Sequence, residues 1–215
     1  MSRIARTAAA AAIGYAVGSV PVGVLVGRVS RGIDVRDHGS HSMGTTNVLR
    51  TAGRGPALAT LLLDIGKGAA AARIGGVLGG RRSGMVAAGL GAVVGHSWPV
   101  FARFHGGKSS AVAFGTVLVA SPPVAGAALL SGVGALAVSR RMSLLSLVGA
   151  AGAVVTAVVV GVRRRDATAV SLVVPGVAIV VLRHRENINR LLRGVEPEVD
   201  MVGAGASTTA EREER

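Results

Sequence analysis

Hydrophobic positions form long runs along the chain, and short polar or basic segments separate them. A membrane helix needs about 20 apolar residues, and seven runs approach or reach that length. They lie at 8–27, 56–73, 83–101, 110–120, 124–138, 144–162 and 167–182. The pattern predicts an all-α integral membrane protein with about seven transmembrane helices and cytoplasmic loops that carry the polar motifs. We expect residues 1–196 to form a single polytopic membrane domain and the polar residues 197–215 a disordered cytoplasmic tail.

The composition supports this prediction. Half of the 215 residues are hydrophobic and only 16% are charged, whereas a soluble domain carries about a quarter charged residues. The chain has no cysteine, which excludes disulfides, thiol nucleophiles and thiolate metal sites.

The net charge of +13 raises the question of nucleic-acid binding. The basic residues, however, lie at the ends of apolar runs, as in Arg81-Arg82 and Arg163-Arg164-Arg165. That placement suits anionic lipid headgroups, and the chain has few aromatic residues for base stacking. Seven crossings place most of the basic residues on the face that carries the polar motifs, which the positive-inside tendency assigns to the cytoplasm.

A polar island, residues 39–50 with the sequence GSHSMGTTNVLR, separates the first two apolar runs. Polar groups beside a bilayer are costly and usually serve a site. Hydroxyls, backbone amides at a helix start and the guanidinium of Arg50 all suit phosphate oxygens. The alternative is a solvated loop rich in turn residues.

Three other polar groups are candidates for chemistry. Gly106-Gly107-Lys108 precedes the fourth run and could cradle a phosphate, although it lacks the P-loop spacing and could equally be a flexible turn. His96 ends the third run and could act as a general base or proton donor, or simply lie at the interface. Asp64 and Lys67 are three residues apart on one helix face, which predicts an ion pair; a proton relay is the alternative.

These segments occur in a fixed order along the chain. They are Gly18-Ser19-Val20-Pro21, the island, Asp64 with Lys67, Gly95-His96 with Pro99, Gly106-Gly107-Lys108, and Arg183-His184 with Asn187 and Glu196. Together they resemble the PlsY family, the bacterial membrane glycerol-3-phosphate acyltransferases that use acyl-phosphate as donor. The resemblance covers about residues 14 to 196, and the island fits the family pattern GSGNxGATNVLR.

The resemblance implies an enzyme that moves a fatty acyl chain from acyl-phosphate to the sn-1 hydroxyl of glycerol 3-phosphate and so makes lysophosphatidic acid for phospholipid synthesis. Ser40 and His96 would be catalytic, at the acyl carbonyl and the attacking hydroxyl. The substrate-binding residues would be Arg50, Lys108, Asn187, Asn47, Thr46 and Gly44, with the backbone of Gly106 and Gly107.

The resemblance also implies partners and a location. The substrates would be acyl-phosphate and glycerol 3-phosphate, and the protein would lie in the cell membrane of a bacterium as a multi-pass protein with its active site on the cytoplasmic face. We expect no nucleic-acid partner, no metal site and no cofactor.

The chain departs from the family pattern at three positions near the expected ligand contacts. His41 and Ser42 replace Gly-Asn in the island, and Ser109 follows Gly-Gly-Lys where the family has glycine. A glycine with positive φ is not replaced without strain. The alternatives are therefore a divergent, non-catalytic member that binds acyl-phosphate or a lipid phosphate, and a small-solute transporter.

Overall fold

The computed structural model describes residues 1–199, and regular structure in that range is entirely helical. The predicted all-α class is confirmed. The predicted tail, 197–215, falls outside the described residues from residue 200 onward. Its first residues, 197–199, come after the last helix. There the Val199 amide donates a hydrogen bond of 2.7 Å to the Arg140 carbonyl.

Ten α-helices and two short 3₁₀ turns occur within residues 1–199. They are α1 (Arg3–Gly18), α2 (Val22–Arg31), η1 (Val35–Asp37), α3 (Thr45–Ala52), α4 (Arg54–Gly79), α5 (Ser83–Ser97), η2 (Val100–Ala102), α6 (Ser110–Ala120), α7 (Pro122–Ser139), α8 (Met142–Arg164), α9 (Thr168–Arg183) and α10 (Arg185–Leu192).

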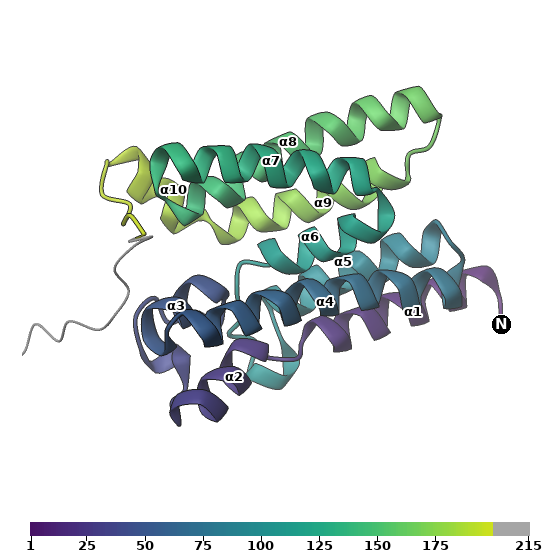
Figure 1. Cartoon of the computed structure of the whole chain (residues 1–215). Coiled ribbons are helices and arrows are strands. Elements are labelled where there is room, and N and C mark those ends of the chain that lie inside the picture. The colour runs from purple at the N-terminus through teal and green to yellow at the C-terminus, as the bar shows by residue number, and fades with distance from the viewer. Residues whose placement is uncertain (200–215) are drawn as a thin grey trace, which may run out of the picture.

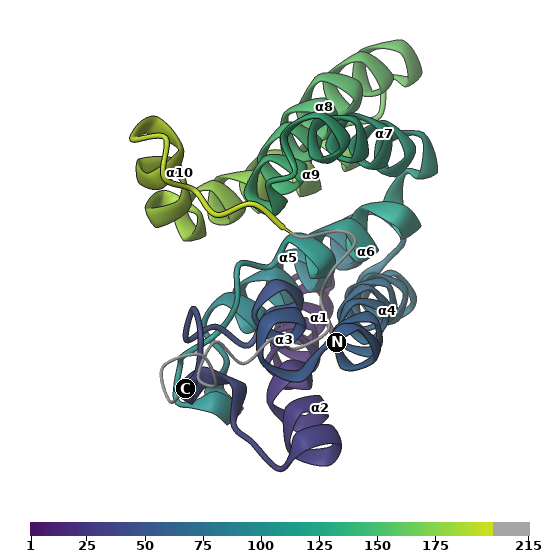
Figure 2. The same ribbon diagram turned by 60° about the vertical axis from the view of Figure 1, so that its left-hand side comes forward.

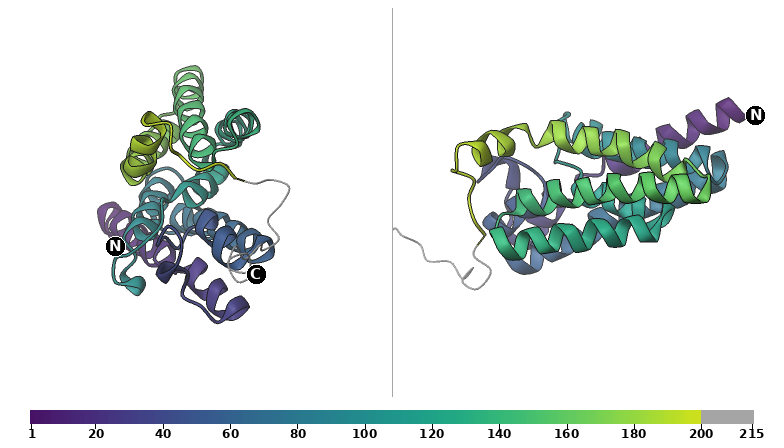
Figure 3. Two further views of the ribbon diagram at one scale, coloured as in Figure 1. Left: turned by 90° about the vertical axis from the view of Figure 1, so that its left-hand side faces the viewer. Right: turned by 90° about the horizontal axis from the view of Figure 1, so that it is seen from above.

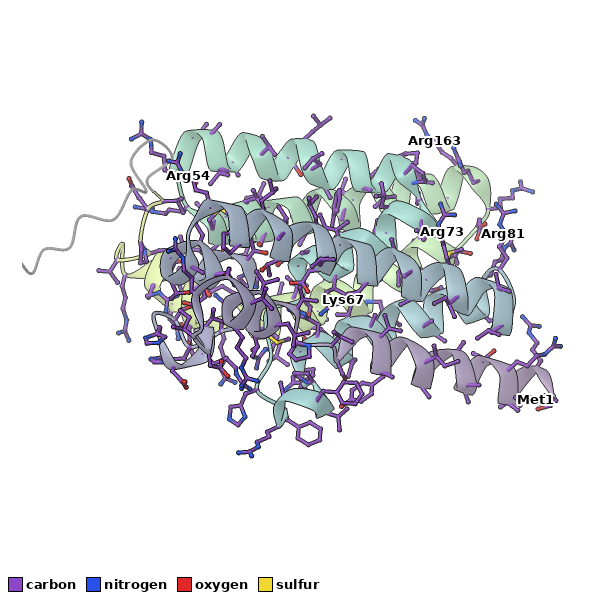
Figure 4. The ribbon with its side chains drawn as sticks, turned by 60° about the horizontal axis from the view of Figure 1, so that its bottom comes forward. Met1, Arg54, Lys67, Arg73, Arg81 and Arg163 are labelled. Atoms are coloured by element: carbon purple, nitrogen blue, oxygen red, sulfur yellow. The ribbon has the colours of Figure 1, made fainter. Side chains whose placement is uncertain are left out.

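The long helices run side by side in two groups, with α1, α4, α5 and α6 in one and α7, α8 and α9 in the other (Figures 1 and 2). The N-terminus lies at one end of this bundle, and α3 and α10 lie at the other (Figure 3). Arg73, Arg81 and Arg163 gather at the end near Met1, and Arg54 lies at the opposite end (Figure 4). The segments that carry the motifs therefore meet at one end.

The first predicted span, 8–27, lies within one apolar segment, 3–31, that is long enough to cross a membrane, but its helix is interrupted. α1 ends at Gly18 and α2 begins at Val22, with Pro21 between them. Proline has no amide hydrogen and its ring clashes with the preceding turn, which breaks a helix. The carbonyl of Val20 that faces the break is satisfied by the Nζ of Lys67 at 2.9 Å.

Four segments of the described chain are long and apolar enough to cross a membrane, at 3–31, 83–102, 122–139 and 142–164. A fifth is possible if α9 and α10, which are bent by 63°, count as one span. α6 has only 11 residues, and α4 carries the ionised pair Asp64 and Lys67. The number of seven crossings stays a prediction.

Small residues let α1 and α5 pack closely. A Cβ atom on Gly14 or Gly18 of α1 would overlap the backbone of Ala88 or Ala92 on α5. Helices in lipid associate through such close backbone contact, because lipid tails supply no hydrophobic drive between helices. Glycine is therefore required on this face of α1.

Gly18→Ala should lower the stability of the purified protein. The added methyl group has no space, and overpacking costs about 1–3 kcal/mol, although alanine is the better helix former by about 1 kcal/mol. The measurement is thermal unfolding in detergent. Gly126→Ala on α7, where a Cβ meets no atom within 4 Å, is the matched control. Equal melting temperatures for the two variants would contradict close packing at Gly18.

Candidate functional site

A cavity of about 360 Å³ lies between the two helix groups. Its polar lining comes from the island, the loop before α6, and α10 with the segment that follows it. Its apolar lining comes from α4, α6, α7, α8 and α9, including Ile65, Phe114, Leu129, Ala153 and Val173. Within this one cavity, charged groups adjoin an apolar interior.

Asn47 organises the island. Its Nδ2 donates to the carbonyls of Val35, His38 and Ser42 at 2.6–3.1 Å, and its Oδ1 accepts from the Ser40 amide at 2.8 Å. The side chain is 1% exposed. Asn47 reaches the cavity wall, but its amide is fully used in folding the loop, so it supports the site rather than offering a free donor.

The folded island presents its hydroxyls and Arg50 to the cavity. Ser40, Gly44, Thr46 and Arg50 all line it, the last three in or next to the first turns of α3. The first amides of a helix have no partner within the helix and favour anions. Arg50 makes no hydrogen bond or ion pair with any other residue of the described range 1–199, so its guanidinium is available to a ligand.

Lys108 faces Arg50 from the loop before α6. It lines the cavity, and its ammonium has no hydrogen-bond partner within residues 1–199. Burial lowers the pKa of Lys108, and the nearby Arg190 lowers it further, while Glu196 opposes the shift. A cluster of cations with too few anions is an arrangement that binds phosphate.

Gly106 and Gly107 do not line the cavity. Their carbonyls accept hydrogen bonds of 3.3 and 3.1 Å from Arg183, and the Gly107 amide donates to the His96 carbonyl at 3.0 Å. A Cβ on Gly107 would overlap the ring of His96. The two glycines therefore pack against His96 and hold it in position. Their backbone does not reach the cavity.

His96 lines the cavity and is joined to the predicted ion pair. Lys67 Nζ lies 2.9 Å from Asp64 Oδ1, which confirms the pair, and also 2.9 Å from His96 Nδ1. All three side chains are buried. The sequence spacing gave the pair, but only the packing of α4 on α5 shows that it reaches His96.

Glu196 fixes the orientation of Asn187. Its carboxylate accepts from Asn187 Nδ2 at 2.6 Å and from Arg190 Nε at 2.7 Å. Burial opposes ionisation of Glu196, yet these donors hold its pKa below the usual value. Glu196 accepts one of the two Nδ2 protons, and Oδ1 of Asn187 is buried without a partner in the described chain.

Eight of the ten expected site residues thus meet at the cavity, and Gly106 and Gly107 do not. The cavity lining also includes residues to which the sequence assigned no role, among them Ser143, His184, Arg190 and Glu196. His184 and Glu196 belong to a motif already noted, and Arg190 lies between them. Ser143, in the first turn of α8, had no signal beyond a polar residue at the start of an apolar run. Within residues 1–199, no group of three or more His, Asp or Glu side chains could hold a metal ion.

The family model described as glycerol-3-phosphate acyltransferase matches residues 8–194 of the chain. The chain belongs to this family. A glycerol-3-phosphate acyltransferase of Parasynechococcus marenigrum is 44% identical over 190 residues, which cover 87% of each chain. One from Rubrobacter xylanophilus is 45% identical over 185 residues, covering 86% of this chain and 90% of that protein.

A solved structure agrees in fold. The crystal structure of PlsY, an integral membrane glycerol 3-phosphate acyltransferase, in its glycerol 3-phosphate form has a TM-score of 0.82 at 33% identity, covering 90% of this chain and 96% of that chain. The expected all-α integral membrane class and the resemblance to the PlsY family are confirmed.

Two of the three departures from the family pattern, His41 and Ser109, fall where the backbone is left-handed. His41 has φ 55° and Ser109 has φ 63°, the region that favours glycine. Each position has its own compensation: His41 Nδ1 bonds the Arg36 carbonyl at 2.9 Å, and Ser109 Oγ bonds the Val93 carbonyl at 2.9 Å and Ser97 Oγ at 2.7 Å. At both positions, local hydrogen bonds thus help this chain to keep the left-handed backbone.

Replacing Ser109 separates strain from hydrogen bonding. Ser109→Ala keeps the left-handed φ and loses two buried hydrogen bonds, which should cost about 2 kcal/mol. Ser109→Gly loses the same bonds but relieves a left-handed cost of about 1–2 kcal/mol, so it should be the more stable variant. Denaturation of both variants in the same detergent measures the difference. A glycine variant less stable than the alanine variant would contradict strain at this position.

Proposed function

We propose that the protein transfers a fatty acyl chain from acyl-phosphate to the sn-1 hydroxyl of glycerol 3-phosphate and releases lysophosphatidic acid, an early step of phospholipid synthesis. The observation that carries this proposal is the cavity between the two helix groups, in which cations without partners in the described range adjoin an apolar interior between α6, α7, α8 and α9. One substrate of this reaction has a phosphate and a long acyl chain, and the other has a phosphate and hydroxyls. Family membership supports the same reaction.

Arg50 and Lys108 hold the substrate phosphates in this proposal. Both lack partners in the described range, and Arg binds phosphate bidentately while Lys acts as a point charge. Thr46 and the first amides of α3 add donors from the island.

Asn187 offers an acceptor to the ligand. Glu196 accepts one Nδ2 proton, and Oδ1 is buried without a partner in the described chain. A phosphate oxygen offers no proton to that atom, whereas a glycerol hydroxyl does. We therefore assign Asn187 to the hydroxyls of glycerol 3-phosphate and leave the phosphates to Arg50 and Lys108.

The chemistry then depends on positioning and electrostatics. Acyl-phosphate is already activated, so holding its carbonyl beside the attacking hydroxyl supplies much of the rate. Ser40 and His96 lie on the cavity wall, where they can orient or polarise that carbonyl. The hydroxyl oxygen bonds to the acyl carbon while the bond from that carbon to the phosphate oxygen breaks. The leaving inorganic phosphate takes the hydroxyl proton, so no acyl-enzyme intermediate is required.

The motif end of the bundle faces the cytoplasm of a bacterial cell in this proposal. The island and α10 lie at the end opposite Met1 (Figure 1), and this end carries the larger share of basic residues. The positive-inside tendency supports the orientation, and both phosphorylated substrates are cytoplasmic in such a pathway step.

Arg50→Ala and Lys108→Ala should each lower acyl transfer from palmitoyl-phosphate to glycerol 3-phosphate by purified protein. Loss of a hydrogen bond to a charged group costs about 1.5–3 kcal/mol, or roughly 10- to 150-fold in kcat/KM. Lysophosphatidic acid formation measures the effect. Arg163→Ala removes the same charge from the opposite end of the bundle (Figure 4) and should leave activity unchanged.

Full activity in both site variants would remove the proposed phosphate roles. Palmitoyl-CoA should not replace palmitoyl-phosphate if the phosphate of the donor is recognised. Tight binding of palmitoyl-phosphate without turnover by the wild-type protein would identify a non-catalytic member of the family and contradict the proposed reaction.

The affinity for glycerol 3-phosphate should weaken at alkaline pH. The cationic form of Lys108 binds phosphate, and burial lowers its pKa below the ordinary value. Binding is therefore complete below this pKa and is lost as pH rises through it. The measurement is KM for glycerol 3-phosphate between roughly pH 7 and 10. Lys108→Arg, whose guanidinium stays charged, should keep its affinity to higher pH; parallel losses in both proteins would exclude Lys108 as the titrating group.

A further inference from the structure

A buried charged cluster connects α4, α5 and the break between α1 and α2. Asp64 is 1% exposed, Lys67 9% and His96 3%. The ion pair of Asp64 and Lys67 has no direct contact with the phosphate-binding cations that the structure describes, so phosphate binding does not explain why it is there. Asp64 and His96 line the cavity, whereas Lys67 lies behind them and is not among the lining residues.

The ammonium of Lys67 has two hydrogen-bond partners and one ion-pair partner. Its Nζ lies 2.9 Å from the Val20 carbonyl, 2.9 Å from Asp64 Oδ1 and 2.9 Å from His96 Nδ1. An ammonium group only donates hydrogen bonds. His96 Nδ1 must therefore be an acceptor, and the single proton of a neutral imidazole must be on Nε2.

The competing tautomer has weaker support. Asp64 Oδ1 lies 3.6 Å from His96 Nδ1, beyond the range of an ordinary hydrogen bond, so Asp64 does not draw the proton to Nδ1. The adjacent Lys67 cation also disfavours the imidazolium form. Both effects leave His96 neutral with its proton on Nε2.

The remaining ring nitrogen, Nε2, is the one that Lys67 does not hold. The His96 ring lines the cavity, and beside its Nε2 stands Gly107, where any side chain would overlap the ring. A neutral imidazole protonated at Nε2 has no lone pair there, so it cannot take a proton from a hydroxyl at that atom. It can donate a hydrogen bond to an oxygen of the acyl-phosphate.

We propose that Lys67 is a positioning residue that holds His96 in the Nε2–H tautomer, so that His96 serves acyl transfer as a hydrogen-bond donor and not as a general base. The catalytic part of this proposal rests on the proposed function. It also gives a role to the Gly18-Ser19-Val20-Pro21 motif, because the helix break exposes the Val20 carbonyl that helps to hold the Lys67 ammonium in place.

The tautomer can be read directly by ¹⁵N NMR of protein labelled at histidine, with the His96 signal assigned by its loss in His96→Gln. We expect an unprotonated Nδ1 and a protonated Nε2 at neutral pH. An Nδ1–H tautomer or an imidazolium would overturn the proposal. This readout needs no turnover, so it stands even if the acyl-transfer assay fails, and that failure would count against the proposed function alone.

Removing Lys67 alone leaves Asp64 as a buried unpaired charge, which is strongly destabilising. The double variant Lys67→Met with Asp64→Val removes both charges and keeps His96. We expect it to fold, to show a mixture of His96 tautomers, and to lose about tenfold or more in kcat with little change in KM for glycerol 3-phosphate. An unchanged tautomer, or an unchanged kcat, in the folded variant would overturn the role of Lys67.

Substitution of His96 distinguishes a donor from a base. His96→Gln places an amide N–H near the position of Nε2, whereas His96→Ala removes the group. Loss of one such donor typically costs roughly 10²-fold in kcat, and we expect the glutamine variant to recover about tenfold of that loss. Equal activity of the two variants, with both folded by thermal unfolding, would contradict a donor role.

Discussion

The ammonium of Lys67 joins four parts of the bundle at one buried point. It extends from α4 to Asp64 on the same helix, to the broken turn between α1 and α2, and to His96 on α5. A buried charge is tolerated only when it is paired and fully hydrogen-bonded. The helix break, the close packing of α1 on α5 and the placement of His96 therefore depend on one another, because each supplies or orients a partner of the same cation.

In the cavity, by contrast, the described chain leaves cations without anionic partners. Arg50 and Lys108 lack anionic partners in the described range, while Glu196 is shared between Asn187 and Arg190. Like charges held close together at the edge of a membrane are unfavourable until an anion arrives. Burial lowers the pKa of Lys108, and the nearby Arg190 lowers it further. One cation cluster is thus completed by the fold, and the other is left incomplete for a ligand.

Much of this arrangement was predictable from the sequence. Apolar runs located α5 to α9 closely, and the spacing of Asp64 and Lys67 gave their pair, because both depend on local periodicity. The roles of Gly106 and Gly107 were not predictable from the sequence, because packing decides whether a glycine faces a ligand or a neighbouring side chain. Ser143 was missed for the same reason: its part in the cavity comes from the packing of the start of α8 beside the segment after α10, where Arg141 pairs with Glu198, and no local pattern encodes that packing.

The cavity has a polar part and an apolar part, and together they determine where each part of a substrate can lie. The polar groups of α3 and α10 lie at one end of the bundle, and the apolar lining continues along α8 from Ser143 to Ala153, about 15 Å at the rise of a helix. A phosphate at the polar end and a hydrocarbon chain in the apolar part place the acyl carbonyl where they meet. Ser40 and His96 lie on the wall of that cavity, and the tautomer of His96 is set from behind by a residue that the substrate never touches.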